Sequence, residues 1–283
     1  MNKKPEWLRT VYTDDSNREL VEEILKRLSL NTVCREANCP NYIECFSKKT
    51  ATFMILGTSC TRNCRFCNVN HSTPQTINPD EPEKIAQAVK ELNLKYVVIT
   101  SVTRDDLPDG GANHFAKAIR AIKINSPKTV VEVLIPDLGG DFNSLKTIAD
   151  EFPAVISHNM ETVASLYQSV RPQAEYQRSL NVLKNIKKLN SKIKSKTGIM
   201  LGLGEQKDEV LRLFDHLRCV ECDFLTIGQY LTPSKEHFPV QEYITPEQFK
   251  QFGKIAEDKG FTFVASAPFV RSSYNAGEAM SIW

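Results

Sequence analysis

The sequence predicts an α/β protein built as a partial (β/α)6 barrel, TIM-like but not closed, with N-terminal and C-terminal extensions that cover the barrel mouth. From residue 50 onward, short apolar runs alternate with longer amphipathic stretches, which is typical of parallel strands joined by helical crossovers. Six such units can be counted, whereas a closed barrel needs eight. The 283 residues are therefore expected to form an N-terminal extension at 1–49, a barrel at 50–260 and a C-terminal segment at 261–283.

The predicted elements follow in chain order. The N-terminal extension is expected to contain an amphipathic helix at residues 18–28, where apolar side chains recur at helical spacing. Strands are expected at 51–56, 96–101, 129–135, 153–157, 196–201 and 223–228. Helices are expected at 82–93, 112–124, 142–150, 161–189, 206–218 and 246–258. The helix at 161–189 should break near Arg171-Pro172, because proline cannot continue a helix. A final extended run, from Phe261 to Ala267, is expected either to join the sheet or to cover it.

Composition excludes several classes of protein. Hydrophobic residues make up 41% and charged residues 25%, which is typical of globular chains and excludes a mainly disordered one. A net charge of +2 does not favour binding to nucleic acid. No apolar run is long enough for a membrane span, and the first seven residues lack the apolar core of a secretory signal. We therefore expect a cytoplasmic protein.

The cysteines carry the strongest signal. Six of the eight lie between residues 34 and 67, as Cys34-x4-Cys39-x5-Cys45 and Cys60-x3-Cys64-x2-Cys67. Such crowding in a long chain indicates metal binding rather than disulfides. Neither set has the four ligands of structural zinc, although zinc remains an alternative. Thiolates also suit iron–sulfur clusters, in which three of them leave one iron free to bind another group.

Several motifs carry a family resemblance. The run C-T-R-N-C-R-F-C at residues 60–67 resembles the signature of radical S-adenosylmethionine enzymes. The stretch from Gly198 to Glu205 is similar to that superfamily's adenine-contact motif, with Met200 at the isoleucine position. The first cysteine set, together with Arg271-Ser272-Ser273-Tyr274, resembles the lipoyl synthases, and the resemblance runs from about residue 30 onward. Supporting stretches lie at residues 51–57, 102–111, 158–163, 170–172 and 225–234.

The resemblance implies a reaction and its partners. Lipoyl synthases insert sulfur at C6 and C8 of an octanoyl chain attached to a lysine of a lipoyl carrier domain, using S-adenosylmethionine and two 4Fe–4S clusters. The implied carriers are the E2 subunits of 2-oxoacid dehydrogenases and the glycine cleavage H protein. A flavodoxin- or ferredoxin-type reductant and an iron–sulfur carrier for cluster repair are also implied. Unactivated C–H carbons need such radical chemistry, because general acid–base groups cannot activate them.

The resemblance also implies a set of site residues. Cys60, Cys64 and Cys67 would hold the radical SAM cluster, which is the cluster that binds S-adenosylmethionine. Cys34, Cys39 and Cys45 would hold the auxiliary cluster, the sulfur donor, with Ser273 as fourth ligand and Ser272 as the alternative. The implied contacts to S-adenosylmethionine are Phe66, Thr100, Ser101, Arg104, Asn159, Glu161, Arg171, Met200 and Glu205. Loop packing for Phe66, and surface salt bridges for Arg104 and Arg171, are the alternatives. No catalytic side chain is expected beyond the cluster ligands.

Other assignments stay open at this point. The chain could be a different radical sulfurtransferase, similar to biotin synthase, or an iron–sulfur sensor or electron carrier. Cys219-x2-Cys222 could be a redox pair or two packed cysteines. Six lysines between residues 184 and 196 could form a docking patch for an acidic carrier or a solvated helix face.

Overall fold

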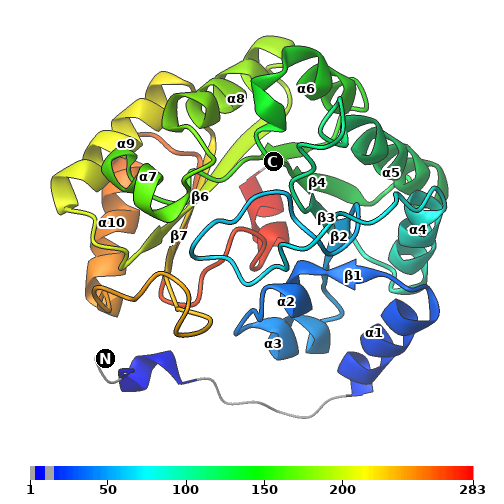
Figure 1. Cartoon of the computed structure of the whole chain (residues 1–283), viewed down its shortest axis with the longest axis horizontal. Coiled ribbons are helices and arrows are strands. Elements are labelled where there is room, and N and C mark those ends of the chain that lie inside the picture. Colours follow the sequence, from blue (N-terminus) through cyan, green and yellow to red (C-terminus); the bar gives the residue numbers. More distant parts are fainter. Residues whose placement is uncertain (1–3, 10–15, 283) are drawn as a thin grey trace.

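The computed structural model describes residues 4–9 and 16–282, and an eight-stranded sheet lies at its centre. The strands lie in chain order from β1 to β8; β1 pairs antiparallel with β2, and all other neighbours are parallel. The strands are β1 (Asn31–Thr32), β2 (Thr52–Ile55), β3 (Tyr96–Ser101), β4 (Val130–Leu134), β5 (Val155–Ser157), β6 (Lys194–Leu201), β7 (Phe224–Gln229) and β8 (Phe263–Ser266). The sheet curves into an open barrel, which confirms the predicted fold class (Figure 1).

Helices cover the outside of the barrel (Figure 1). The α-helices are α1 (Ser16–Arg27), α2 (Val33–Glu36), α3 (Tyr42–Ser47), α4 (Glu81–Glu91), α5 (Ala112–Asn125), α6 (Phe142–Ala149), α7 (Tyr167–Val170), α8 (Tyr176–Leu189), α9 (Lys207–Cys219) and α10 (Pro246–Asp258). Four short 3-10 helices are η1 (Glu6–Leu8), η2 (Leu138–Gly140), η3 (Ala164–Leu166) and η4 (Ala276–Ile282). None of the helices in the described ranges is long and apolar enough to cross a membrane.

Local sequence explains the boundaries of the elements. Thr245 caps the N-terminus of helix α10: its hydroxyl accepts from the Gln248 amide while the Gln248 side chain accepts from the Thr245 amide. The predicted break between α7 and α8 lies at residues 171–175, where Pro172 ends the helical pattern. The six predicted strands correspond to β2–β7.

The terminal segments differ from the expectation in detail. Within the N-terminal extension, Cys34 lies in α2 and Cys45 in α3, two short helices that the sequence did not predict. The extended run at 261–267 forms β8, so the sheet continues into the segment assigned to the C-terminal extension. The strand β1 was not predicted, because two residues are too short for a period-2 pattern.

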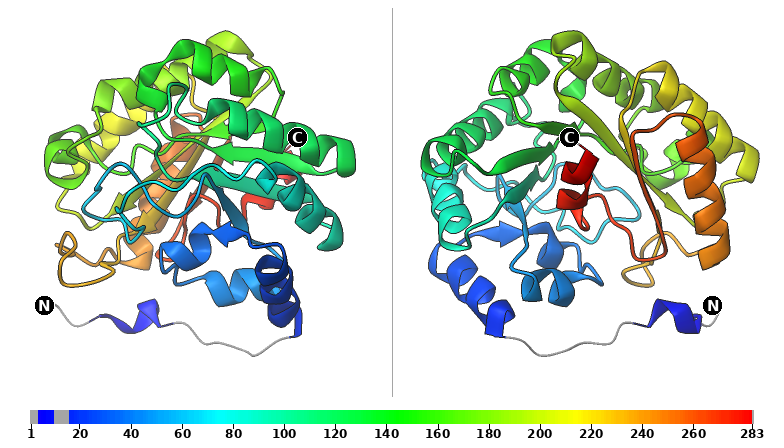
Figure 2. Two further views of the ribbon diagram at one scale, coloured as in Figure 1. Left: turned by 45° about the vertical axis from the view of Figure 1, so that its right-hand side comes forward. Right: turned by 180° about the vertical axis from the view of Figure 1, so that it is seen from behind.

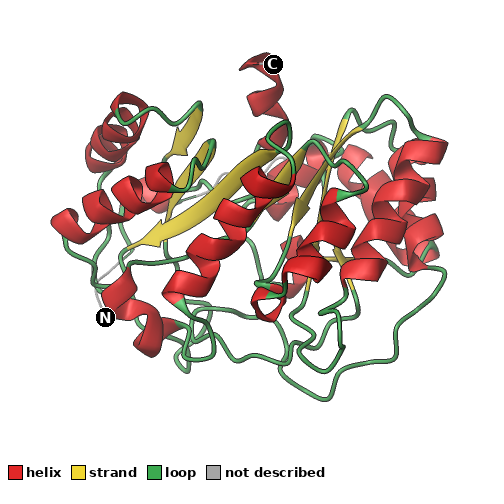
Figure 3. Ribbon diagram, turned by 90° about the horizontal axis from the view of Figure 1, so that it is seen from above, coloured by secondary structure: helices red, strands yellow, loops and turns green. Residues whose placement is uncertain are grey.

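The C-terminal segment packs against both ends of the barrel. Arg271 to Tyr274 lie at the mouth, as expected, but η4 packs at the opposite end (Figures 2 and 3). There Ala279 is buried against Val155 and Phe224, which begin β5 and β7. The tail thus runs from the mouth to the floor of the barrel.

The barrel interior contains a buried ion pair. The Lys196 ammonium lies 2.8 Å from Glu132 Oε1, and the Tyr96 hydroxyl donates to Glu132 Oε2 at 2.6 Å. Lys196 is therefore not part of an exposed basic stretch, and Lys187 and Lys194 both pair with Asp223. Lys184, Lys188 and Lys192 are exposed, so a docking patch or a solvated face over residues 184–196 would rest on these three charges.

Candidate functional site

A cavity of about 440 Å³ lies at the carboxyl ends of the parallel strands. All six clustered cysteines line it, together with the strand-end residues Thr100, Ser101, His158, Asn159, Glu161, Met200, Gln229 and Tyr230 and the tail residues Arg271 to Tyr274. The carboxyl ends of parallel strands are where barrels of this type place their chemistry. The fold therefore brings together residues from the N-terminal extension, the barrel and the tail.

The two cysteine sets form two groups in the cavity wall. Burial raises the pKa of the Cys45 thiol to about 12, and the nearby Cys34 and Cys39 raise it further. Burial likewise raises the pKa of Cys67 to about 12, with Cys64 and Cys60 adding to the rise. The members of each set are thus within electrostatic reach of one another.

These residues fit iron–sulfur clusters by their donor chemistry. Burial keeps thiols such as Cys45 and Cys67 protonated, and they become good ligands when a metal replaces their protons. Soft sulfur donors select iron–sulfur centres or zinc over hard cations. Within residues 4–9 and 16–282, no three His, Cys, Asp or Glu side chains converge on the position of a single ion.

The second cysteine set lies on an irregular loop that follows β2. The loop begins at Leu56, whose φ of 68° is unusual for a non-glycine residue. Two buried side chains hold this turn: Glu81 accepts from the Leu56 amide at 3.0 Å, and Arg104 donates to the Leu56 carbonyl at 3.1 Å. Cys60 accepts from the Thr103 amide at 3.3 Å. Barrel side chains thus fix the direction in which the loop leaves the sheet.

Unpaired polar atoms mark one wall of the cavity. His158 Nε2, Asn159 Oδ1, Arg171 Nε and Ser101 Oγ are buried without a hydrogen-bond partner in the described structure. His158 Nδ1 lies 2.9 Å from the Ile135 carbonyl, so Nδ1 carries the proton and Nε2 is an acceptor. Burial, and then the charge of Arg171, lower the pKa of His158 to about 4. These atoms are available to a bound polar molecule.

Asn159, Glu161 and Arg171 form a connected group on that wall. Asn159 Nδ2 donates to Glu161 Oε1 at 3.0 Å, and Arg171 Nη1 donates to the carbonyl of Asn159 at 3.0 Å. Burial raises the pKa of Glu161, while the Arg171 charge opposes the rise. The alternative of a surface salt bridge is wrong for Arg171, which is buried.

Two predicted contacts, Arg104 and Glu205, do not line the cavity. The Arg104 guanidinium pairs with Asp106 at 2.8 Å, so its charge is already balanced. Glu205 accepts from the amides of Gly202 and Leu203 at 2.6 and 2.9 Å, which shapes the turn after β6. By contrast, Phe66 and Met200 do line the cavity, as do Thr100 and Ser101.

The two tail serines differ in their contacts. Ser272 Oγ accepts from Asn159 Nδ2 at 2.7 Å. Ser273 has no hydrogen bond through its hydroxyl in the part of the chain that is described, and it lines the cavity. The tail is tied to the first cysteine set, because Asn41 donates to the Phe269 carbonyl at 2.6 Å and Tyr274 to Glu44 at 3.0 Å. The Ser273 hydroxyl is thus freer than the Ser272 hydroxyl to coordinate a metal.

Sequence reasoning missed several residues at this site. Gln229 and Tyr230 line the cavity at the end of β7, and His237 donates to the Cys67 carbonyl at 3.1 Å. Polar side chains just past a predicted strand were the available signal for Gln229 and Tyr230. Cys222 is buried and Cys219 exposed, and neither lines the cavity.

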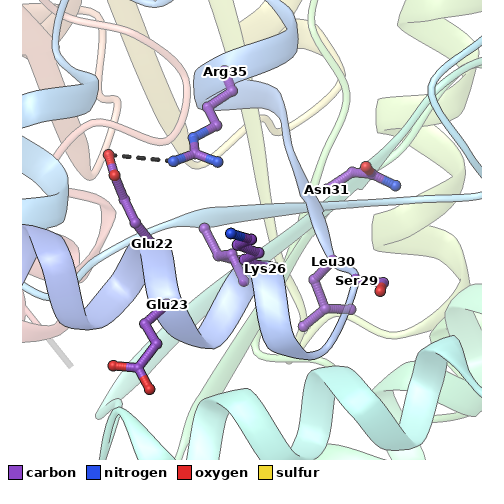
Figure 4. A pocket seen from close by; sticks show the side chains of 8 residues that line it. Glu22, Glu23, Lys26, Ser29, Leu30, Asn31 and Arg35 are labelled. Atoms are coloured by element: carbon purple, nitrogen blue, oxygen red, sulfur yellow. Dashed lines mark ion pairs between the residues drawn. The ribbon is translucent and has the colours of Figure 1, made fainter.

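A second hollow, of about 560 Å³, lies over α1, β1 and α2 (Figure 4). Arg35 crosses it to reach Glu22 at 3.2 Å, and exposed side chains such as Glu23 and Lys26 form its rim. No cysteine lines it, so the chemistry of the chain lies in the first cavity.

Comparison with known proteins agrees with the cavity's composition. The profile of the Radical SAM superfamily matches residues 54–217. A lipoyl synthase of Alkaliphilus metalliredigens is 55% identical over 280 residues, which cover 99% of this chain and 97% of the relative. A lipoyl synthase of Caldicellulosiruptor saccharolyticus is 56% identical, with 99% and 98% covered.

Solved structures share the fold at low sequence identity. HydG, a maturase of the FeFe-hydrogenase, has a TM-score of 0.62 at 16% identity and covers 95% of this chain and 61% of its own. Methylornithine synthase has a TM-score of 0.53 at 13% identity, with 89% and 82% covered. These likenesses concern the arrangement of strands and helices alone.

Proposed function

Since the chain belongs to the lipoyl synthase family of the Radical SAM superfamily, we propose that its mouth cavity holds both clusters and the substrates of that family's reaction. The chain is a radical SAM sulfurtransferase that uses S-adenosylmethionine and 4Fe–4S clusters. It inserts sulfur at C6 and C8 of an octanoyl chain on a lipoyl carrier protein. The observation that supports the proposed site is the convergence of six thiols and the tail serines on one cavity.

Cys60, Cys64 and Cys67 are the ligands of the cluster that binds S-adenosylmethionine. When bound, this cofactor pair supplies the one-electron chemistry that removes hydrogen from an unactivated carbon. The chain's own part would be to present three thiolates from one loop, on the side of that loop that lines the cavity. Phe66, which packs against Val170, Leu203 and Tyr230, shields this side from water.

The polar wall orients S-adenosylmethionine. Arg171 has an unpaired Nε at the cavity and offers it to the methionine carboxylate, because guanidinium donors suit carboxylates. Asn159 and Glu161 offer an amide oxygen and a carboxylate to ribose hydroxyls. Thr100, Ser101 and Met200 complete this wall. Arg104 and Glu205 already have hydrogen-bond partners within the fold, so we assign them to shaping the loops around the site rather than to contacting S-adenosylmethionine.

Cys34, Cys39, Cys45 and Ser273 hold the auxiliary cluster, the sulfur donor. The free hydroxyl of Ser273 favours it over Ser272, which Asn159 already engages. An oxygen ligand is harder than a thiolate and would bind iron less tightly, so Ser273 would supply the most easily released ligand of the auxiliary cluster.

The partners follow from this chemistry. The substrates are octanoylated E2 domains and H protein, electrons come from a flavodoxin- or ferredoxin-type protein, and an iron–sulfur carrier rebuilds the donor cluster. A cytoplasmic location fits eight free cysteines, because the cytosol keeps thiols reduced. The lysines at 184–196 lie near the amino end of β6, away from the cavity, so the carrier docks elsewhere.

The test is a single-turnover assay on anaerobically reconstituted protein with S-adenosylmethionine, reductant and an octanoyl-lysine peptide. We expect the peptide to gain two sulfur atoms, read by mass, together with formation of 5′-deoxyadenosine. Cys64→Ala should abolish both products, whereas Cys39→Ala should abolish only sulfur insertion. If Cys39→Ala also abolished 5′-deoxyadenosine formation, or Cys64→Ala retained it, the assignment of the two sets would be wrong.

A further inference from the structure

Arg62 lies inside the cysteine loop, between Cys60 and Cys64, and the residue is 7% exposed. We propose that Arg62 is a positioning residue, which holds the loop in its ligand-presenting shape through Asp105 and Asp137 before any cluster is bound. The inference rests on the proposed function only in that the loop's cysteines are taken as cluster ligands.

The guanidinium is held by two carboxylates, each in a two-point contact. Arg62 Nε and Nη2 donate to Asp105 at 2.7 Å each, and Nη1 and Nη2 donate to Asp137 at 2.8 Å each. A planar fork can satisfy two carboxylates in this way, whereas the point charge of lysine cannot.

The two carboxylates come from different parts of the barrel mouth. Asp105 follows β3, and Asp137 follows β4 and is fully buried. Asp137 is itself fixed, because it accepts from the Gly139 amide at 3.1 Å and from Arg178 at 3.4 Å. The loop is therefore anchored on two consecutive strands.

Backbone contacts extend this anchor along the loop. The Thr61 amide donates to the Thr103 carbonyl at 3.0 Å, and the Thr61 hydroxyl accepts from the Asp105 amide at 3.0 Å. Farther on, the Arg65 amide donates to the Val170 carbonyl at 2.9 Å. The loop has no helix or strand of its own, so its shape depends on contacts such as these and on Arg62.

The charge balance indicates how Arg62 acts. Its single positive charge faces two carboxylates, and it does not line the cavity. It is thus not available as a counter-ion for a cluster or for a methionine carboxylate. Its effect on the reaction must pass through the position of the loop.

The test compares Arg62→Lys with the native chain by amide hydrogen exchange, in both the cluster-free and the reconstituted full-length protein. In the cluster-free protein we expect exchange at residues 61–67 to rise at least about tenfold, with β3 and β4 still protected. Arg120→Lys is the matched control, since Arg120 pairs with Glu151 on an exposed surface and should change nothing.

A second readout follows the cluster itself. In Arg62→Lys we expect less iron at the loop and an altered electron paramagnetic resonance spectrum of the reduced cluster with S-adenosylmethionine. Asp105→Asn, which removes charge at a part-exposed position, should give an intermediate result even if Arg62→Lys folds poorly.

Unchanged loop exchange in Arg62→Lys, or an equal loss of protection in β3 and β4, would overturn the proposal. The exchange measured without clusters does not depend on which reaction the protein performs. A failure of this inference is therefore distinguishable from a failure of the proposed function.

Discussion

Gly228 on β7 lies directly against the tail that carries the two serines. A Cβ atom at this position would be 2.0 Å from the Val270 carbonyl oxygen and 3.2 Å from Arg271 Nη1. An ordinary carbon–oxygen contact is about 3.3 Å, so in Gly228→Ala the carbonyl must retreat by about 1 Å or more. Overpacking of this kind costs about 1–3 kcal/mol, which the tail can relieve by leaving the cavity.

Displacement of Val270 carries Ser273, three residues on, away from the first cysteine set. Because misplacement by about 1 Å can cost about 100-fold in rate, we expect lipoyl product to fall on that order. Formation of 5′-deoxyadenosine should fall less, because the thiols at 60–67 lie on the loop after β2, and the tail reaches the proposed S-adenosylmethionine wall through the Ser272–Asn159 hydrogen bond. The assay is the single-turnover ratio of lipoyl product to 5′-deoxyadenosine.

The control is Gly277→Ala, in the same tail, where the new Cβ would be 3.5 Å from the nearest atom, Tyr96 Cβ. This is an ordinary contact and should leave the ratio unchanged. An unchanged ratio in Gly228→Ala, or an equal fall in both products, would refute the reasoning.

Three further predictions follow from the cavity and the barrel interior. The pKa of His158 is about 4 in the folded state, whereas its ordinary value is 6.5. Between these two pH values the unfolded chain takes up a proton at His158 that the folded chain does not. The free energy of unfolding should therefore fall by about 3 kcal/mol from this group as the pH drops from 6.5 to 4. Urea titrations of cluster-free protein should show this component, and His158→Asn should lack it. Ser273→Ala should lower iron retention and sulfur insertion, whereas Ser272→Ala should keep most of both; the reverse order would assign the ligand to Ser272. Lys196→Met leaves the Glu132 carboxylate buried without its counter-charge, so thermal unfolding should show a loss of about 3–5 kcal/mol, and a loss below about 1 kcal/mol would mean that water reaches this carboxylate.

The alternation of strands and helices was predictable because each strand is an apolar run bounded by turn residues. The cysteine spacings also indicated the cavity's chemistry, since ligands on one loop are local in sequence. Strand β1 was not predicted because it is only two residues long. The two short helices around the first cysteine set were not predicted because they lack a full amphipathic repeat.

Long-range pairing could not be predicted. The charge of Lys196 looks solvated beside its neighbouring lysines, and only the barrel brings it to Glu132, 64 residues away. Arg62 finds its partners 43 and 75 residues along the chain. Arg104 was expected to contact S-adenosylmethionine, but its guanidinium pairs with Asp106, two residues along the chain.

The tail that runs from the mouth to the floor of the barrel has a consequence for the order of folding. Its contact with the N-terminal extension joins Asn41 to Phe269 across 228 residues. During synthesis the N-terminal part of a chain forms first, so the thiols at 34–45 emerge long before Ser273. Closing so distant a contact is slow, although the entropy cost grows only with the logarithm of the separation. The proposed donor site for sulfur is therefore completed only after the whole barrel has folded, and a half-made chain cannot present it.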